Sequence, residues 1–131
     1  MTDLLPTHTC FDDAVANMAI LLNQNGIQVK DEIRIVHAII APYGKPLAHA
    51  WVTFRGRAYF SGVMPGGWRA GVSMETERYE RGMKVVEATR YTIDEAVAEE
   101  LEKGIGPWKP EYRALCNAPK EKADERQTDG R

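Results

Sequence analysis

Cys10 has the greatest potential for covalent chemistry in this sequence, because it stands in the first turn of a predicted helix, directly after Thr9, a common capping residue. The unpaired N–H groups and the positive dipole end at a helix start lower the pKa of a thiol and can hold a developing oxyanion. Asp12 and Asp13 oppose this effect with nearby negative charge. Cys10 is therefore a candidate nucleophile, and the alternative is a small buried hydrophobic residue.

His49 is the candidate base. It lies in the segment LAHAWVTF (47–54), which alternates like a strand, and a histidine in such a place is more often packed than catalytic. The three histidines, at positions 8, 37 and 49, and the two cysteines show no metal-ligand spacing, and the sequence holds no glycine-rich phosphate loop. We therefore expect no metal and no cofactor.

The elements that must position Cys10 and His49 follow from the hydrophobic periodicity. Apolar residues recur every three or four positions after Cys10 and after Thr92, where Glu95 completes a capping box, and they alternate in between. The expected elements are a helix over 10–25, strands over 33–40, 47–54, 58–63 and 85–91, a loop over 64–71, a charged helix over 74–83 and a helix over 92–104. This order predicts an α+β domain in which the N-terminal helix that carries Cys10 packs on a small antiparallel sheet.

Two of these elements carry a burial prediction. The first strand is apolar on both faces, which predicts that both faces are buried. The last helix should bury an apolar stripe formed by Ile93, Ala96, Val97 and Leu101.

Composition bounds the class of protein. The 131 residues include 17 basic and 19 acidic side chains. The sequence therefore lacks the excess of positive charge that is typical of proteins that bind nucleic acid or an anionic membrane. Two cysteines make no disulfide framework, and the first residues show no secretion signal, so we expect a cytoplasmic protein with reduced thiols. Residues 1–116 are expected to form a single domain and the polar residues 117–131 a disordered tail.

The order of a cysteine at a helix start, a histidine opening a strand about 40 residues later, and then a hairpin resembles the papain-like thiol hydrolases in their compact bacterial form, which includes NlpC/P60-type and transglutaminase-like enzymes. The sequence also looks like a group of small bacterial and phage proteins of this type. The resembling segments are CFDDAVANMAILL (10–22), RIVHAIIAPYGKPLAHAWV (34–52) and VVEATRYTIDEAVAEELEKGIGPW (85–108).

The resemblance implies a papain-like fold and a cysteine peptidase or amidase that acts on a protein or peptide. Cys10 would be the nucleophile and His49 the base and later the acid, through an acyl-enzyme. The Cys10 N–H would be one oxyanion donor, with Thr7, His8 or Thr9 as a second. Two alternatives remain open: a binding or inhibitory protein on this fold that has lost catalysis, and an acyl or amine transferase that uses the same thioester.

The group usually has an Asp or Asn on the strand after the histidine strand, and here that stretch reads RAYFSGV (57–63). Ser61 is the candidate orienting group, with Tyr59 as the other polar choice. A three-residue turn at 55–57 would put Ser61 on the His49 face, whereas a turn of Arg55 and Gly56 alone would turn it away.

Three further side chains are candidate substrate contacts: Trp51, beside His49, and Trp68 and Arg69 in the expected loop. Core packing is the alternative for Trp51.

For several other residues we expect a structural role and not a catalytic one. His37 is expected to be a core histidine, and Trp108 should anchor the C-terminal loop. Asn17 shares a helix face with Cys10 and is either a buried polar partner or a surface residue. Cys116 is expected to take no part in the chemistry.

Overall fold

The protein was analysed as a computed structural model that describes residues 10–64 and 67–116. Its regular elements, in chain order, are α1 (Cys10–Asn25), the 3-10 helix η2 (Ile27–Glu32), β1 (Ile33–Ile40), β2 (Leu47–Phe54), β3 (Arg57–Met64), β4 (Gly67–Glu75), α2 (Thr76–Met83), β5 (Val85–Tyr91) and α3 (Ile93–Lys103). A further helical stretch covers 110–116. The expected α+β class, with an N-terminal helix on an antiparallel sheet, is confirmed.

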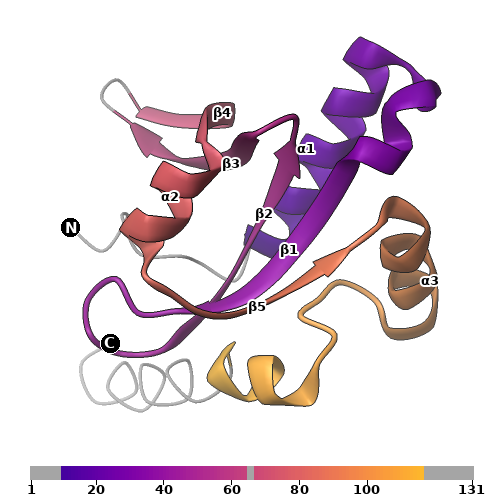
Figure 1. The fold of residues 1–131 in the computed structure, drawn as a ribbon. Helices are drawn as coiled ribbons and strands as arrows, with labels where there is room; N and C mark the ends of the chain where they lie inside the picture. The colour runs from indigo at the N-terminus through magenta and orange to yellow at the C-terminus, as the bar shows by residue number, and fades with distance from the viewer. Residues whose placement is uncertain (1–9, 65–66, 117–131) are drawn as a thin grey trace.

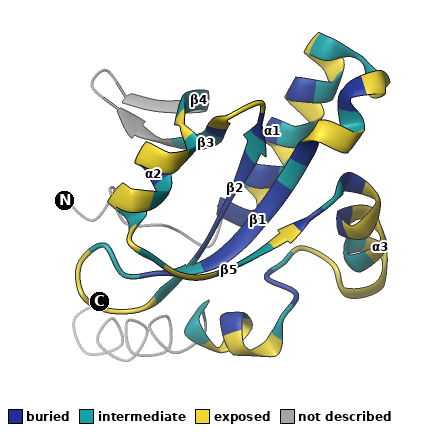
Figure 2. Ribbon diagram, viewed as in Figure 1, coloured by how far each residue is buried: buried dark blue, intermediate teal, exposed yellow. Residues whose placement is uncertain are grey.

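The five strands form one antiparallel sheet in the order β4-β3-β2-β1-β5. Helix α1 lies behind the sheet and α2 in front of it, while α3 lies beside the β5 edge (Figure 1). The sheet therefore separates two hydrophobic clusters, and its central strands are buried on both faces (Figure 2).

The register of β1 against β2 assigns each residue to one of these clusters. Ile35 lies opposite Val52, and both belong to the cluster under α1. Val36 lies opposite Trp51, and both belong to the cluster under α2. Because side chains alternate along a strand, His49 shares the α2 face with Trp51, whereas its neighbour Ala50 faces α1. The prediction that the first strand is buried on both faces is confirmed.

The turn between β2 and β3 contains only Arg55 and Gly56, both with positive φ (52° and 80°). Two-residue turns of this kind match the twist of a hairpin. This turn sets the register in which Val52 pairs with Tyr59. The described pairing of β2 with β3 covers three residue pairs, from Phe54–Arg57 to Val52–Tyr59. Beyond them the two strands share no described pairing, and this is where the candidate site lies.

The segment 64–71 was expected to be a loop, and this prediction is wrong for most of it, because β4 begins at Gly67. Strand β4 lies at the edge of the sheet and pairs with β3 although it contains Gly67 and Gly71. The charged helix begins at Thr76, since Met74 and Glu75 still belong to β4.

Helix α3 has the predicted capping box between Thr92 and Glu95. Its apolar stripe is narrower than predicted: Ile93 and Ala96 are buried, but Val97 is 42% and Leu101 84% exposed. The cause is the position of α3 beside the β5 edge, where only one side of the helix meets the core. The tail predicted over 117–131 lies outside the described residues.

Candidate functional site

Cys10 is the first residue of α1, and its side chain is 7% exposed within the cluster under that helix. The sulfur accepts a hydrogen bond from the main-chain N–H of Ala50, a residue of β2 that has no described partner in β3. Burial raises the pKa of the Cys10 thiol far above its ordinary value, and the nearby Cys116 and Asp13 add to the rise. Desolvation therefore outweighs the helix start, and the thiol is neutral at pH 7.

His49 is also buried, at 7% exposure, but it points to the α2 side of the sheet. Its Nε2 lies 2.9 Å from the hydroxyl of Tyr79, and among the described residues its Nδ1 has no hydrogen-bond partner. Burial lowers the pKa of His49 to about 4, so the imidazole is neutral at pH 7.

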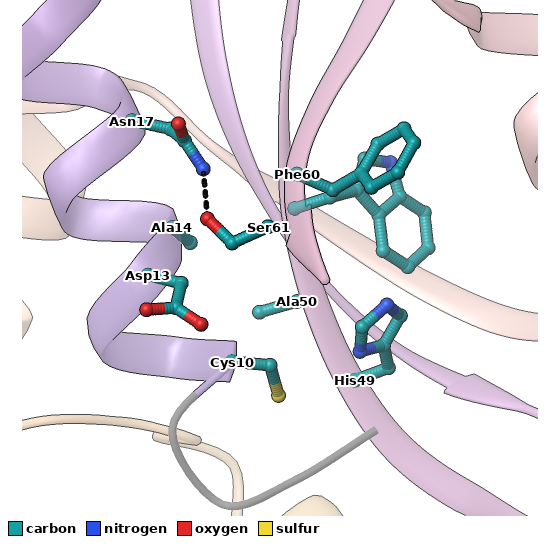
Figure 3. A pocket seen from close by; sticks show the side chains of 9 residues that line it. Cys10, Asp13, Ala14, Asn17, His49, Ala50, Phe60 and Ser61 are labelled. Atoms are coloured by element: carbon teal, nitrogen blue, oxygen red, sulfur yellow. Dashed lines mark hydrogen bonds between the residues drawn. The ribbon is translucent and has the colours of Figure 1, made fainter. Parts of the chain in front are cut away.

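Although Cys10 and His49 belong to opposite sides of the sheet, they line one pocket. The pocket lies where the pairing of β2 with β3 has stopped, and both faces of the sheet contribute to it (Figure 3). Its lining residues are Cys10, Asp13, Ala14, Asn17, His49, Ala50, Trp51, Phe60 and Ser61. The structure thus brings together the two residues that the sequence singled out as nucleophile and base.

Ser61 is not the partner of His49, which corrects the sequence expectation. With the two-residue turn, Ser61 falls on the α1 side, where its hydroxyl accepts a hydrogen bond from Asn17 Nδ2 (3.3 Å; Figure 3). Tyr79, from α2, occupies the hydrogen-bonding position next to the imidazole instead. Asn17 is buried at the wall of the pocket, so it is a buried polar residue and the surface alternative is wrong.

The three candidate substrate contacts have different outcomes. Trp51 is fully buried, and its indole donates a hydrogen bond to Glu80 Oε2 (3.3 Å), so it forms the pocket wall from the core side. The backbones of Trp68 and Arg69 lie in β4, opposite Val63 and Gly62. Their side chains lie outside the described part of the chain, so their contact with substrate stays a prediction.

His37 is a core residue, as expected. It is surrounded by the rings of Phe11, Tyr91 and Trp108, at centroid distances of 4.7, 5.3 and 4.5 Å. Burial lowers its pKa to about 3, and within residues 10–64 and 67–116 its Nδ1 has no hydrogen-bond partner. Trp108 donates its indole N–H to the carbonyl of Gly104 (2.8 Å), which confirms that it anchors the C-terminal loop.

Cys116 packs against the same hydrophobic cluster as Cys10 but does not line the pocket. Partial burial raises the pKa of its thiol.

Tyr79 is the site residue that the sequence reasoning missed. Helix α2 reads TERYERGM, and Tyr79 is its only aromatic residue. In a helix that is otherwise charged, such a residue is the one that must face the sheet, and this signal was available.

Among the described residues, no group of three or more histidine, cysteine or acidic side chains is arranged to hold a metal ion. No helix in the described ranges is both long and apolar enough to cross a bilayer.

The fold and pocket define an α+β domain with a buried cysteine and histidine at a break in an antiparallel sheet. Comparison with protein-family models, with curated proteins and with solved structures gives no match.

Proposed function

We propose that this protein is a papain-like cysteine hydrolase, a peptidase or amidase, in which Cys10 is the nucleophile and His49 the base. The observation that carries the proposal is that both residues line the same pocket, with the thiol at the first residue of α1. Cys10 and His49 belong to different elements and to opposite faces of the sheet, so they meet at the pocket only through the tertiary fold.

The reaction begins when the Cys10 thiol passes its proton to His49 during the attack of its sulfur on the substrate. The sulfur attacks the carbonyl carbon of an amide, the tetrahedral intermediate collapses, and His49 returns the proton to the leaving amine. Water, activated by His49, then hydrolyses the acyl-enzyme and frees Cys10. The main-chain N–H of Cys10, in the first turn of α1, is a candidate oxyanion donor.

The test uses a simple acyl donor, p-nitrophenyl acetate, and intact-protein mass spectrometry to detect the acyl-enzyme. We expect acetylation at Cys10 that is lost in Cys10→Ala and persists in Cys116→Ala, the matched control for the second thiol. His49→Ala should slow acylation on the order of a hundredfold or more, as expected for loss of a general base. Equal, slow acetylation of both thiols would contradict the proposal.

A second candidate is a binding or inhibitory protein that has lost catalysis. It is favoured by one observation: the thiol and imidazole are both buried and neutral, and no carboxylate or amide hydrogen-bonds His49 among the described contacts. Such a protein would keep its partner and its biological effect in Cys10→Ala. A transferase acting through the same thioester would give an adduct with an added primary amine, whereas a hydrolase would release the free acid.

A further inference from the structure

Tyr79 is held rigidly at the far side of the pocket wall. Its ring stacks on Phe60, with centroids 4.4 Å apart and planes 21° apart, and meets Trp51 edge-on at 5.4 Å. The start of α2 is tied to the hairpin by the Thr76 N–H, which donates to the Gly56 carbonyl (2.9 Å). The side chain is 5% exposed, so its hydroxyl has a fixed position in the core.

That hydroxyl makes the buried hydrogen bond to Nε2 of His49 (2.9 Å). Nδ1 is the other ring nitrogen, and no residue in the described part of the chain hydrogen-bonds it. The imidazole edge is turned toward the side of the pocket on which Cys10 lies (Figure 3). One nitrogen of the ring is therefore anchored by α2, and the other remains for chemistry in the pocket.

We propose that Tyr79 is a positioning residue for His49, which takes the role that a carboxylate or amide fills in related hydrolases. This inference rests on the proposed function. In this role the phenol oxygen accepts Nε2–H, which requires the neutral tautomer with its proton on Nε2 and makes Nδ1 the base. When the Cys10 S–H bond breaks and Nδ1–H forms, Nε2–H still donates to Tyr79, and the ring keeps its orientation through the reaction.

The test measures the second-order rate constant for alkylation of Cys10 by iodoacetamide, with Cys116 in the same molecule as the internal reference. We compare the wild type with Tyr79→Phe, His49→Ala and the double variant. Tyr79→Phe keeps the aromatic stack and removes one hydrogen bond to a ring that becomes charged, so we expect alkylation to slow about ten- to a hundredfold. The double variant should be no slower than His49→Ala, because Tyr79 acts through His49.

Tyr112→Phe is the matched control. It also removes a phenol hydroxyl from a fully buried ring, one that hydrogen-bonds Thr89 and Glu87 and lies outside the pocket. Its alkylation rate should equal that of the wild type. A normal rate in Tyr79→Phe together with a slow rate in His49→Ala overturns the role of Tyr79 and leaves the hydrolase proposal standing. A normal rate in His49→Ala overturns both.

A second measurement does not depend on Tyr79→Phe folding. Ring ¹⁵N shifts of His49 in the wild-type protein should show the proton on Nε2, and a proton on Nδ1 overturns the inference. Fluorination of the tyrosine at position 79 weakens the phenol oxygen as an acceptor without removing it, and should slow Cys10 alkylation. The same fluorination at position 112 should leave the rate of Cys10 alkylation unchanged. Equal alkylation rates for the two fluorinated proteins would also overturn the inference.

Discussion

Acidification should destabilise this fold, because two buried imidazoles, His37 and His49, are neutral in it. Burial lowers their pKa values to about 3 and about 4, from an ordinary value of 6.5. In both cases the folded state binds fewer protons than the unfolded state over the interval between the two pKa values. The stability is therefore complete above about pH 6.5 and is lost as the pH falls toward the folded-state values.

At about pH 5 the unfolded histidines are mostly charged and the folded ones are still neutral. Each pH unit below the unfolded pKa lowers the free energy of unfolding by about 1.4 kcal/mol per histidine. Since pH 5 lies about 1.5 units below that pKa, each histidine lowers it by about 2 kcal/mol and the pair by about 4 kcal/mol. This is a large share of the roughly 5–15 kcal/mol that stabilises an ordinary domain. Ordinary carboxyl groups titrate near pH 4, so this window mainly reports histidine.

Urea unfolding followed by tryptophan fluorescence, at about pH 7.5 and about pH 5, measures this difference for each protein. His37→Leu and His49→Gln should each halve the loss to about 2 kcal/mol, whatever their stability at neutral pH, and the double variant should lose little. Tyr112→Phe should behave like the wild type. If the single variants lose as much as the wild type, the imidazoles are not the buried neutral groups described above.

Two further substitutions test the packing. Gly106→Ala should destabilise the protein by about 1–3 kcal/mol in urea unfolding, because the new Cβ would meet the ring of His37 within the aromatic cluster. Leu101→Gln should change the free energy of unfolding by less than about 0.5 kcal/mol, since this side chain of α3 is 84% exposed, and a larger loss would contradict the placement of α3 beside the β5 edge.

The predictable parts of the fold were those with strong local periodicity. The bounds of α1, β1 and β2 agree with the sequence prediction, because each contains a run of apolar residues with one period and a clear stop. Strand β4 was missed because its glycines signal a loop, and edge pairing with β3 overrides that signal. The exposure of Val97 and Leu101 depends on where α3 lies relative to the sheet, which no local pattern specifies.

The candidate site was predictable only in part. Cys10 and His49 were found from a helix start and a strand, but the orienting group was not. Which side chain faces His49 depends on the register of the β2–β3 hairpin. The turn that sets this register requires a positive φ at Arg55, a residue other than glycine, so the sequence left two registers open. Tyr79 lies 30 positions beyond His49, in a helix for which the sequence predicted charge but no partner in the sheet.

The chemistry of the pocket differs from a resting thiolate–imidazolium pair for a physical reason. Burial raises the pKa of Cys10 and lowers that of His49, so proton transfer between them would create two charges in a desolvated site. Tyr79 is neutral and supplies no negative charge to stabilise an imidazolium, as a carboxylate would. If Cys10 is the nucleophile, the proton must therefore leave the sulfur as the carbonyl is attacked, when the developing negative charge passes to the substrate oxygen. Such an enzyme uses its cysteine as serine hydrolases use their hydroxyl, with a neutral nucleophile and a neutral base.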